Sequence, residues 1–248
     1  MKKFKGLAHI HSNYSDGKYS LKKLKQMFKG KIQFIMINDH KEMMSNEKIK
    51  QMKNECKKIS TSNFLAIPGI ECKLNENVHL LVSGLGKRRL EQLRTIVHIN
   101  KEFLKKRFFN LKSIDCIEVW NRYNDGILPN SKSLQIFTKL KENYGNLHAT
   151  GGLELHSSIQ TDIIIEVLCE KLTEKQILTS IKRGHFISYS KNIILFPDGN
   201  ITYLKNRNML FVKNVIYLFL RKVAIFGRKL SWKPKPILKI YHKICGEK

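Results

Sequence analysis

Two histidines and an aspartate near the start of the chain have the spacing of a metal site. His9 and His11 fall within a stretch that reads as a strand, residues 7–11, and side chains two residues apart on a strand point to the same side. Both imidazoles can therefore reach one ion, and Asp16 lies in the following loop, where it can turn back toward them. Taken alone, a histidine pair of this kind is more often a polar surface pair, so the interpretation depends on further ligands.

Further imidazoles and carboxylates stand just after later apolar stretches. They are His40, Glu71, Glu154 and His156. In parallel β/α architectures the loops that follow the strands meet at one end of the molecule, so these side chains are expected to converge. Imidazole and carboxylate ligands without thiolates favour zinc, manganese or iron, and this number of candidates suits a site for more than one ion.

Short apolar stretches alternate with helix-like segments from the start of the chain to about residue 190, a pattern typical of β/α units. We expect strands at residues 7–11, 32–38, 65–70, 78–85, 94–98, 114–119, 147–151 and 163–168. We expect helices at residues 20–28, 45–59, 101–109, 134–142 and 173–184. The predicted fold class is α/β, a closed or nearly closed β/α barrel of about seven strands.

The pattern changes after residue 190. Residues 192–196 and 201–204 flank a turn-rich tetrad, which predicts a β-hairpin. A helix is expected over residues 209–226, with an apolar face formed by Met209, Val212, Ile216, Phe219, Leu220, Val223 and Phe226. Residues 205–248 hold 12 Lys or Arg and one acid, Glu247. We therefore divide the chain into a domain at residues 1–190 and a hairpin with a basic helical tail at residues 191–248.

Composition limits the class of protein. The 248 residues include 46 Lys or Arg and 20 Asp or Glu, for a formal net charge of +26, which permits attraction to phosphate groups of many kinds. Five widely spaced cysteines indicate neither a disulfide framework nor a zinc ribbon and favour a reducing compartment. We find no apolar stretch of signal-peptide or membrane-spanning type. We expect a cytoplasmic protein, at most peripheral to the inner face of the membrane.

Seven short motifs occur in an order that resembles the PHP superfamily, named for polymerase and histidinol phosphatase domains. They are His9-x-His11-Ser12, Ser15-Asp16-Gly17, Asp39-His40, Pro68-Gly69-Ile70-Glu71, His79-Leu80-Leu81, Ile117-Glu118-Val119-x-Asn121 and Glu154-x-His156. The chain is most similar to the metal-dependent phosphoesterase branch, over roughly residues 5–190. The resemblance implies a distorted seven-stranded β/α barrel with a two- or three-metal site that hydrolyses phosphoesters.

Carried over position by position, the resemblance also assigns the metal ligands. The first metal would be held by His9, His11, Glu71 and Glu154, the second by Glu71, His79 and His98, and the third by Asp16, His40 and His156. Glu154 stands where the family has Asp, and its extra methylene would shift or weaken the first position.

The function expected is hydrolysis of a phosphate mono- or diester by a metal-activated water. Asp16, His40 or His156 would help to protonate the leaving group. Arg122 and Lys101 are candidates for contacts with the phosphate of a phosphorylated small molecule or nucleotide. The alternative is a weakly or non-catalytic metal-binding module, recruited through its basic tail to an anionic membrane or to nucleic acid. The apolar face of the helix at residues 209–226 would then contact lipid, or it would instead pack on the barrel.

Overall fold

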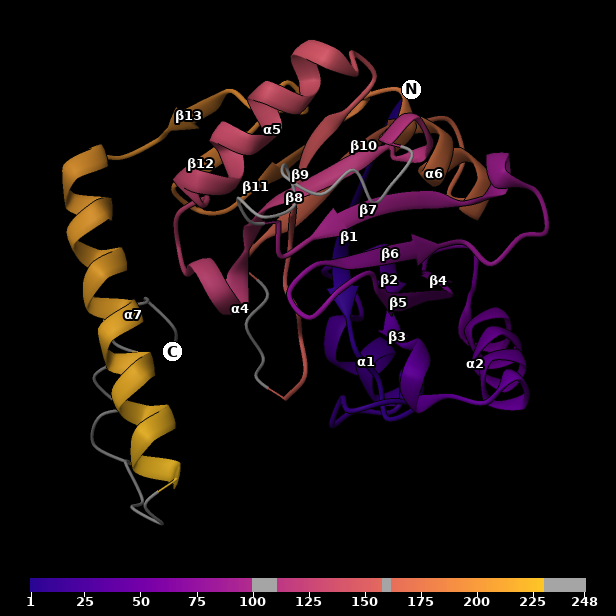
Figure 1. Ribbon diagram of the computed structural model, residues 1–248. Coiled ribbons are helices and arrows are strands. Elements are labelled where there is room, and N and C mark those ends of the chain that lie inside the picture. The colour runs from indigo at the N-terminus through magenta and orange to yellow at the C-terminus, as the bar shows by residue number, and fades with distance from the viewer. Residues whose placement is uncertain (100–110, 158–161, 230–248) are drawn as a thin grey trace.

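Two mixed β-sheets and six α-helices make up the part of the chain that the computed structural model describes, residues 1–99, 111–157 and 162–229 (Figure 1). The α/β class predicted from the sequence is confirmed. The predicted helix at residues 101–109 lies outside the described residues.

The first sheet is built around the strand that carries His9. In spatial order its strands are β13 (Ile201–Tyr203), β12 (Ile193–Leu195), β11 (Phe186–Tyr189), β10 (Ile164–Cys169), β1 (Lys2–Ile10), β2 (Phe34–Ile37) and β4 (Leu65–Ile67). β1 is parallel to β2 and antiparallel to β10. Every side chain of β2 is buried, as expected of the apolar stretch at residues 32–38.

The second sheet carries most of the remaining candidate ligands. In spatial order its strands are β3 (Asp39–His40), β5 (Gly69–Lys73), β6 (His79–Ser83), β7 (Leu93–Val97), β8 (Cys116–Asn121) and β9 (His148–Gly152). The segment after β9 runs beside β1, because the Leu153 amide donates to the Ala8 carbonyl and the His11 amide to the Leu155 carbonyl, both at 3.0 Å. The ends of β1 and β9 are thus held side by side, which brings the two groups of ligands together.

The helices begin where the sequence provides a capping side chain. They are α1 (Leu21–Phe28), α2 (Asn46–Ile59), α4 (Arg122–Asp125), α5 (Ser131–Asn143), α6 (Glu174–Lys182) and α7 (Arg207–Lys229). Ser20 and Ser45 cap α1 and α2, each accepting from the amide three residues later. Leu21, Leu24 and Phe28 form the buried face of α1, as their spacing predicted.

The strand pairing differs from the single barrel that the alternating pattern predicted. The described strands form two sheets, and β5 to β7 run antiparallel to one another, as do β10 to β13. Most of these strands are joined by connections of nine residues or fewer, too short for the crossover that a parallel pair needs, whereas β10 and β11 are joined through α6 and still pair antiparallel. The predicted strand at residues 65–70 is also divided, because Pro68 has no amide hydrogen to continue the ladder.

The predicted hairpin is present as β12 and β13. β12 also pairs with β11, so the division at residue 190 falls between two paired strands of one sheet. α7 follows and stands at one side of the molecule, beside α4 (Figure 1). Most of the predicted apolar face is not the docking face. Leu210 and Tyr217 are buried, whereas Met209, Val212, Ile216, Phe219 and Phe226 are exposed; Leu220 and Val223 of the predicted face are half-buried.

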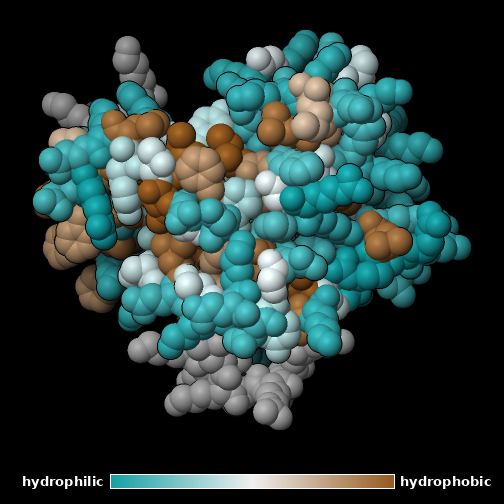
Figure 2. Space-filling model, turned by 90° about the horizontal axis from the view of Figure 1, so that it is seen from above, coloured by the Kyte–Doolittle hydropathy of each residue, from teal (hydrophilic) through white to brown (hydrophobic). Residues whose placement is uncertain are grey.

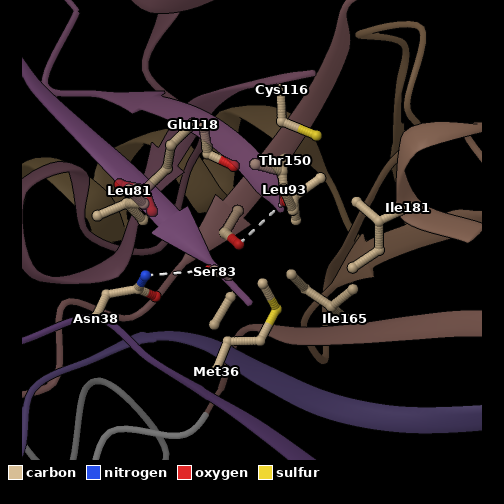
Figure 3. A pocket seen from close by; sticks show the side chains of 13 residues that line it. Met36, Asn38, Leu81, Ser83, Leu93, Cys116, Glu118, Thr150, Ile165 and Ile181 are labelled. Carbon is tan, nitrogen blue, oxygen red and sulfur yellow. Dashed lines mark hydrogen bonds between the residues drawn. The ribbon is translucent and has the colours of Figure 1, made fainter. Parts of the chain in front are cut away.

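The two sheets enclose a cavity of about 20 Å³, room for about one water molecule. The residues that line it include Ala8, Met36, Ser83, Thr150 and Ile165. In its wall the side-chain amide of Asn38 donates to Ser83 Oγ at 3.0 Å (Figure 3). Glu118 on β8 also lines this cavity and, on its other side, contacts the ligand cluster. The interior behind the candidate site is therefore closely packed.

Candidate metal centre

The loop after β1 is folded around one buried carboxylate. Asp39 accepts hydrogen bonds from the Ser12 amide at 2.7 Å and from the hydroxyls of Ser12 and Ser15, both at 2.6 Å. The amides of Ser15 and Gly17 both donate to the Ser12 carbonyl, which closes the loop. A side chain at Gly17 would overlap the His11 carbonyl, so glycine is needed there. This turn brings Asp16 back toward the strand end, as predicted.

Glu71 lies at the centre of the cluster and is almost fully buried. Its Oε2 atom is 3.4 Å from His9 Nε2 and 3.3 Å from His11 Nε2. The same oxygen is 3.6 Å from His40 Nδ1. One carboxylate oxygen thus faces His9 on β1, His11 just beyond β1 and His40 on β3.

The second oxygen of Glu71 faces a different pair of histidines. Its Oε1 atom is 2.6 Å from His79 Nδ1 on β6 and 3.7 Å from His98 Nε2, just beyond β7. A carboxylate whose two oxygens face separate sets of imidazoles has the arrangement of a ligand that bridges two ions. The structure therefore brings His79 and His98 to the site although 18 residues separate them in the sequence.

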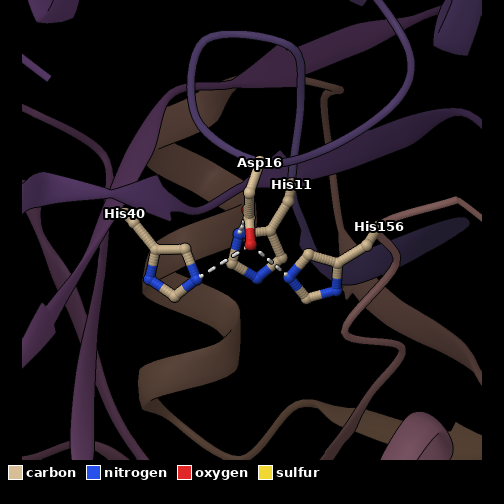
Figure 4. A group of neighbouring side chains, drawn as sticks. All are labelled: His11, Asp16, His40 and His156. Carbon is tan, nitrogen blue, oxygen red and sulfur yellow. Dashed lines mark ion pairs between the residues drawn. The ribbon is translucent and has the colours of Figure 1, made fainter. Parts of the chain in front are cut away.

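A further group lies nearer the surface, around Asp16. His156 Nε2 and His40 Nε2 lie 3.1 and 3.5 Å from Asp16 Oδ2, and His11 Nδ1 lies 3.5 Å from Asp16 Oδ1 (Figure 4). The His11 and His156 rings stack with centroids 4.1 Å apart. The side chains of His40, His156 and Asp16 are 19, 24 and 36% exposed, whereas those of His9 and His11 are fully buried. This group therefore forms the mouth of the site, above a buried floor.

The ligand atoms form three overlapping groups, and within each group all lie within 4.8 Å of one another. The groups are His11, Asp16, His40 and His156; His9, His11 and Glu71; and Glu71, His79 and His98. His11 and Glu71 each belong to two groups. The three sets correspond to the three metal positions that the resemblance implies, with Glu154 absent from them and His11 added to the third.

Several observations fit divalent cations bound by these groups. Both ring nitrogens of His11 are buried with no hydrogen-bond partner among the described residues. Two ligand atoms about 2.1 Å from one tetrahedral ion lie about 3.4 Å apart. The contacts of His9 and His11 with Glu71, at 3.4 and 3.3 Å, match that separation better than they match a hydrogen bond. Nitrogen and oxygen donors of this kind suit borderline divalent metals.

Burial and charge set the protonation of the floor residues. Burial lowers the pKa of His11 well below its usual value, and the charges of His9 and His156 lower it further, so this ring is neutral and has a free lone pair. Burial also opposes charge on His9, but Glu118 and Glu71 outweigh it and raise the pKa of His9 well above its usual value. Burial would raise the pKa of Glu71, but His9 and the hydrogen bond from His79 lower it, and the carboxylate is ionised.

Glu118 fixes the orientation of His9. Its Oε2 atom is 3.0 Å from His9 Nδ1, which leaves Nε2 directed at Glu71. The other oxygen of Glu118 accepts from the Asn121 side-chain amide at 2.7 Å. A Cβ atom at Gly152 would overlap the Glu118 carboxylate, so a glycine on β9 is required for this contact. Glu118 thus acts on the site through His9.

Three candidate ligands have a strained backbone. His9, His98 and Glu154 have φ angles of 59°, 57° and 49°, and they are the three described residues other than glycine with positive φ. Residues with a Cβ atom rarely adopt this left-handed conformation, and when they do they are often at functional sites. The left-handed backbone thus directs these side chains toward the cluster and lowers the free energy of unfolding.

Glu154 approaches the cluster but is held by two amides. Its Oε2 atom accepts from Asn121 Nδ2 at 2.7 Å and from Asn124 Nδ2 at 2.6 Å. Its Oε1 atom lies 3.7 Å from His98 Nε2. The extra methylene therefore carries one oxygen toward the asparagines, and the role of Glu154 as a metal ligand stays a prediction.

The two predicted phosphate-binding residues are placed differently. Arg122 is fully buried, its Nε donates to both oxygens of Asp162 at 2.7 and 2.6 Å, and its guanidinium lies 4.5 Å from the centre of the Tyr217 ring. These contacts give Arg122 a place in the interface with α7. Lys101 lies outside the described residues. Contact of either with substrate stays a prediction.

Four residues that position ligands had no predicted role: Asp39, Glu118, Asn121 and Asn124. The sequence holds a signal for Glu118, a carboxylate within an otherwise apolar strand, because a buried charge needs a partner. Asn124 carries no comparable signal, because it lies in a short polar helix.

No protein-family model and no curated protein matches the sequence. A match is found to the crystal structure of a two-domain protein from Bacteroides vulgatus ATCC 8482 that contains a predicted PHP-like metal-dependent phosphoesterase. The TM-score is 0.57 and the sequence identity 16%, over 78% of this chain and 66% of the other. The chain thus spans just under two thirds of that protein's length. The likeness shows a PHP-like fold.

Proposed function

We propose that the protein is a metal-dependent hydrolase that cleaves a phosphate mono- or diester. The observation that carries the proposal is Glu71, which is buried and whose two oxygens face different sets of histidines. A carboxylate between two ions is the arrangement used by enzymes that clamp the attacking and leaving oxygens of a phosphoryl transfer. The likeness to a protein that contains a predicted PHP-like phosphoesterase supports the same reaction class.

In this proposal the strands around the metal centre, which come from both sheets, belong to the distorted seven-stranded β/α barrel that the resemblance implies. The three overlapping ligand groups hold two or three zinc, manganese or iron ions, with Glu154 beside the buried groups. Such ions, when bound, supply water activation and neutralise charge on the phosphoryl oxygens. Glu118 holds the ring of His9 in position, and the tightly packed interior excludes bulk water from the floor of the site.

Proton transfer is assigned to the mouth of the site. The side chains of His40, His156 and Asp16 are partly exposed, so they can reach a leaving group that extends into solvent. His156 and Asp16 are 3.1 Å apart, close enough for the carboxylate to orient the imidazole as it donates a proton. These three are therefore the proposed catalytic residues, with His40 and His156 as proton donors and Asp16 as the carboxylate that orients His156.

The rim next to His156 suits a phosphorylated small molecule or a nucleotide. The Tyr123 ring is 39% exposed, and its centroid is 6.0 Å from that of His156. The Arg221 guanidinium lies 4.0 Å from the centre of the same ring. An aromatic face and a cation at the rim can bind a base or sugar and a phosphate, respectively.

The proposal is tested by elemental analysis of the purified protein together with hydrolysis assays on a panel of mononucleotides and phosphodiesters with added Mn²⁺ or Zn²⁺. His11→Ala removes a ligand from two groups, so it should abolish hydrolysis and lower the metal content while the protein stays folded. His185→Ala is the matched control, because His185 is exposed and lies outside the three groups. Wild-type turnover by His11→Ala would refute the assignment.

A second candidate function is a metal-binding module without appreciable activity. It is favoured by Glu154, whose carboxylate is held by Asn121 and Asn124 where the family has a shorter acid. Metal bound by the wild-type protein without turnover of any phosphoester would support this alternative.

A further inference from the structure

α7 presents an apolar face to solvent. This outward face consists of Met209, Val212, Ile216, Phe219 and Phe226, which are 39 to 64% exposed, with Phe211 and Val215 beside them at 61 and 51%. The spacing of 3, 4, 3 and 7 residues keeps all five on one side of a helix with 3.6 residues per turn. Apolar side chains gather at the surface on the side of the molecule where α7 lies (Figure 2). Exposed apolar surface of this extent marks an interaction site.

The orientation of α7 is fixed by contacts on its opposite face. The Asn214 side chain accepts from the Ile127 amide at 2.8 Å and donates to the Asp125 carbonyl at 3.2 Å. Tyr217 is 1% exposed and packs against the Arg122 guanidinium. These contacts pair specific polar groups, so rotating the helix to bury Phe219 would break them. The outward face is therefore exposed as a consequence of how α7 is docked.

The charge of α7 indicates the kind of partner. The helix carries six cations and no acid: Arg207, Lys213, Arg221, Lys222, Arg228 and Lys229. Lys213 and Lys222 fall on the two flanks of the outward face, at positions from which lysine can extend toward a lipid headgroup while its stem stays on apolar surface. No described helix is long and apolar enough to cross a membrane.

We propose that α7 binds the surface of an anionic phospholipid membrane, lying in the plane of the interface with its outward face among the acyl chains. A second copy of this chain fits less well, because pairing two such faces would place their lysines together with no acid on α7 to neutralise them. Nucleic acid would satisfy the charge but leave the aliphatic side chains of the outward face without a partner. An anionic bilayer satisfies both features.

Vesicle sedimentation with the full-length protein tests the proposal, and it does not depend on any hydrolytic activity. We expect binding to phosphatidylglycerol–phosphatidylcholine vesicles that weakens as salt rises, and little binding to pure phosphatidylcholine. Phe219→Glu should weaken binding about tenfold or more, because an aromatic ring that would lie among the acyl chains is replaced by a charge. Lys222→Gln should weaken binding less and reduce the salt dependence. Leu90→Glu is the matched control, since Leu90 is exposed far from α7 in the sequence and should bind like wild type.

Phe219 and Lys222 are exposed, so both variants should keep the wild-type melting temperature and metal content. Failure of the full-length protein to prefer anionic vesicles would overturn the proposal. Equal vesicle binding by wild type and Phe219→Glu would also overturn it and would show that the protein contacts lipid through a surface other than the outward face of α7. A dimer that Phe219→Glu dissociates, without vesicle binding, would identify the occupant as a second copy. Binding to DNA but not to vesicles would identify it as a nucleic acid.

Discussion

Glu118→Gln should lower metal affinity while leaving the fold intact. Both oxygens of Glu118 act as acceptors, one from His9 Nδ1 at 3.0 Å and one from Asn121 Nδ2 at 2.7 Å. A glutamine has one oxygen, so one of these contacts would place two N–H donors against each other. His9 can relieve the conflict by moving its proton to Nε2, but that nitrogen is the one that faces Glu71. A conflict at His9 weakens its hold on a metal directly, and a conflict at Asn121 removes the contact that holds residue 118 in place and so loosens the support of His9.

The size of the effect follows from burial. Changing a residue that orients a metal ligand typically lowers affinity about 10- to 100-fold, or about 1.4 to 2.7 kcal/mol. The His9 side chain is fully buried and that of Glu118 is 2% exposed, so water cannot replace the lost acceptor. The upper part of the range is therefore expected. The unsatisfied donor should also lower the free energy of unfolding by about 1 to 3 kcal/mol.

Metal dissociation constants from competition with a chelating dye would measure this effect, with urea denaturation to confirm that the protein is folded. Glu166→Gln is a suitable control, because Glu166 pairs with Lys3 outside the metal centre. Unchanged metal affinity in Glu118→Gln would show that the contact with His9 does not support metal binding.

Two further predictions concern carboxylates close to the centre. Glu154→Asp should keep or raise hydrolysis, since a shorter side chain is less able to reach Asn121 and Asn124 and restores the acid found in the family; loss of activity would indicate a site rebuilt around glutamate. Burial raises the pKa of Asp125 to about 6, although hydrogen bonds from the Asn121 backbone amide and the Asn130 side chain oppose the shift. As the pH rises, the unfolded chain therefore loses this proton near pH 4, whereas the folded protein keeps it until about pH 6. The free energy of unfolding should therefore fall by up to about 3 kcal/mol between about pH 4 and 6. Urea denaturation should show a smaller fall for Asp125→Asn, and identical pH dependence in the two proteins would contradict this assignment of the proton.

Local signals in the sequence were enough to locate most elements and most of the residues that gather in the candidate metal centre. Ser20 and Ser45 mark helix starts because their hydroxyls can accept from free amides, which depends only on residues a turn away. His9, His11 and Asp16 were found together because their spacing is local and the loop between them is short. His40 and Glu71 lie farther apart in the sequence, and the structure brings them together because β3 and β5 pair in parallel with these two residues in register.

Non-local features were harder to predict. The division into two sheets depends on whether each pair of strands runs parallel or antiparallel, which apolar periodicity does not encode. The alternative in which the predicted apolar face of α7 packs on the barrel was wrong for most of that face, and contact of the face with lipid stays a prediction. The docking of α7 depends on Leu210 entering the core and on Asn214 and Tyr217 finding partners on α4 and after it, which helical periodicity does not encode. The position of the Glu154 carboxylate depends on Asn124, which no local pattern connects to it.

The left-handed backbone at His9, His98 and Glu154 lowers the stability of the fold while it positions candidate metal ligands. Each such residue costs about 1 to 2 kcal/mol relative to an ordinary conformation, against a total of about 5 to 15 kcal/mol for a typical domain. Glycine at any of the three positions would relieve that strain while deleting a candidate ligand. A lineage that no longer needed the metals would therefore gain stability by losing these side chains, so their retention with a strained backbone would itself be a mark of selection for the centre.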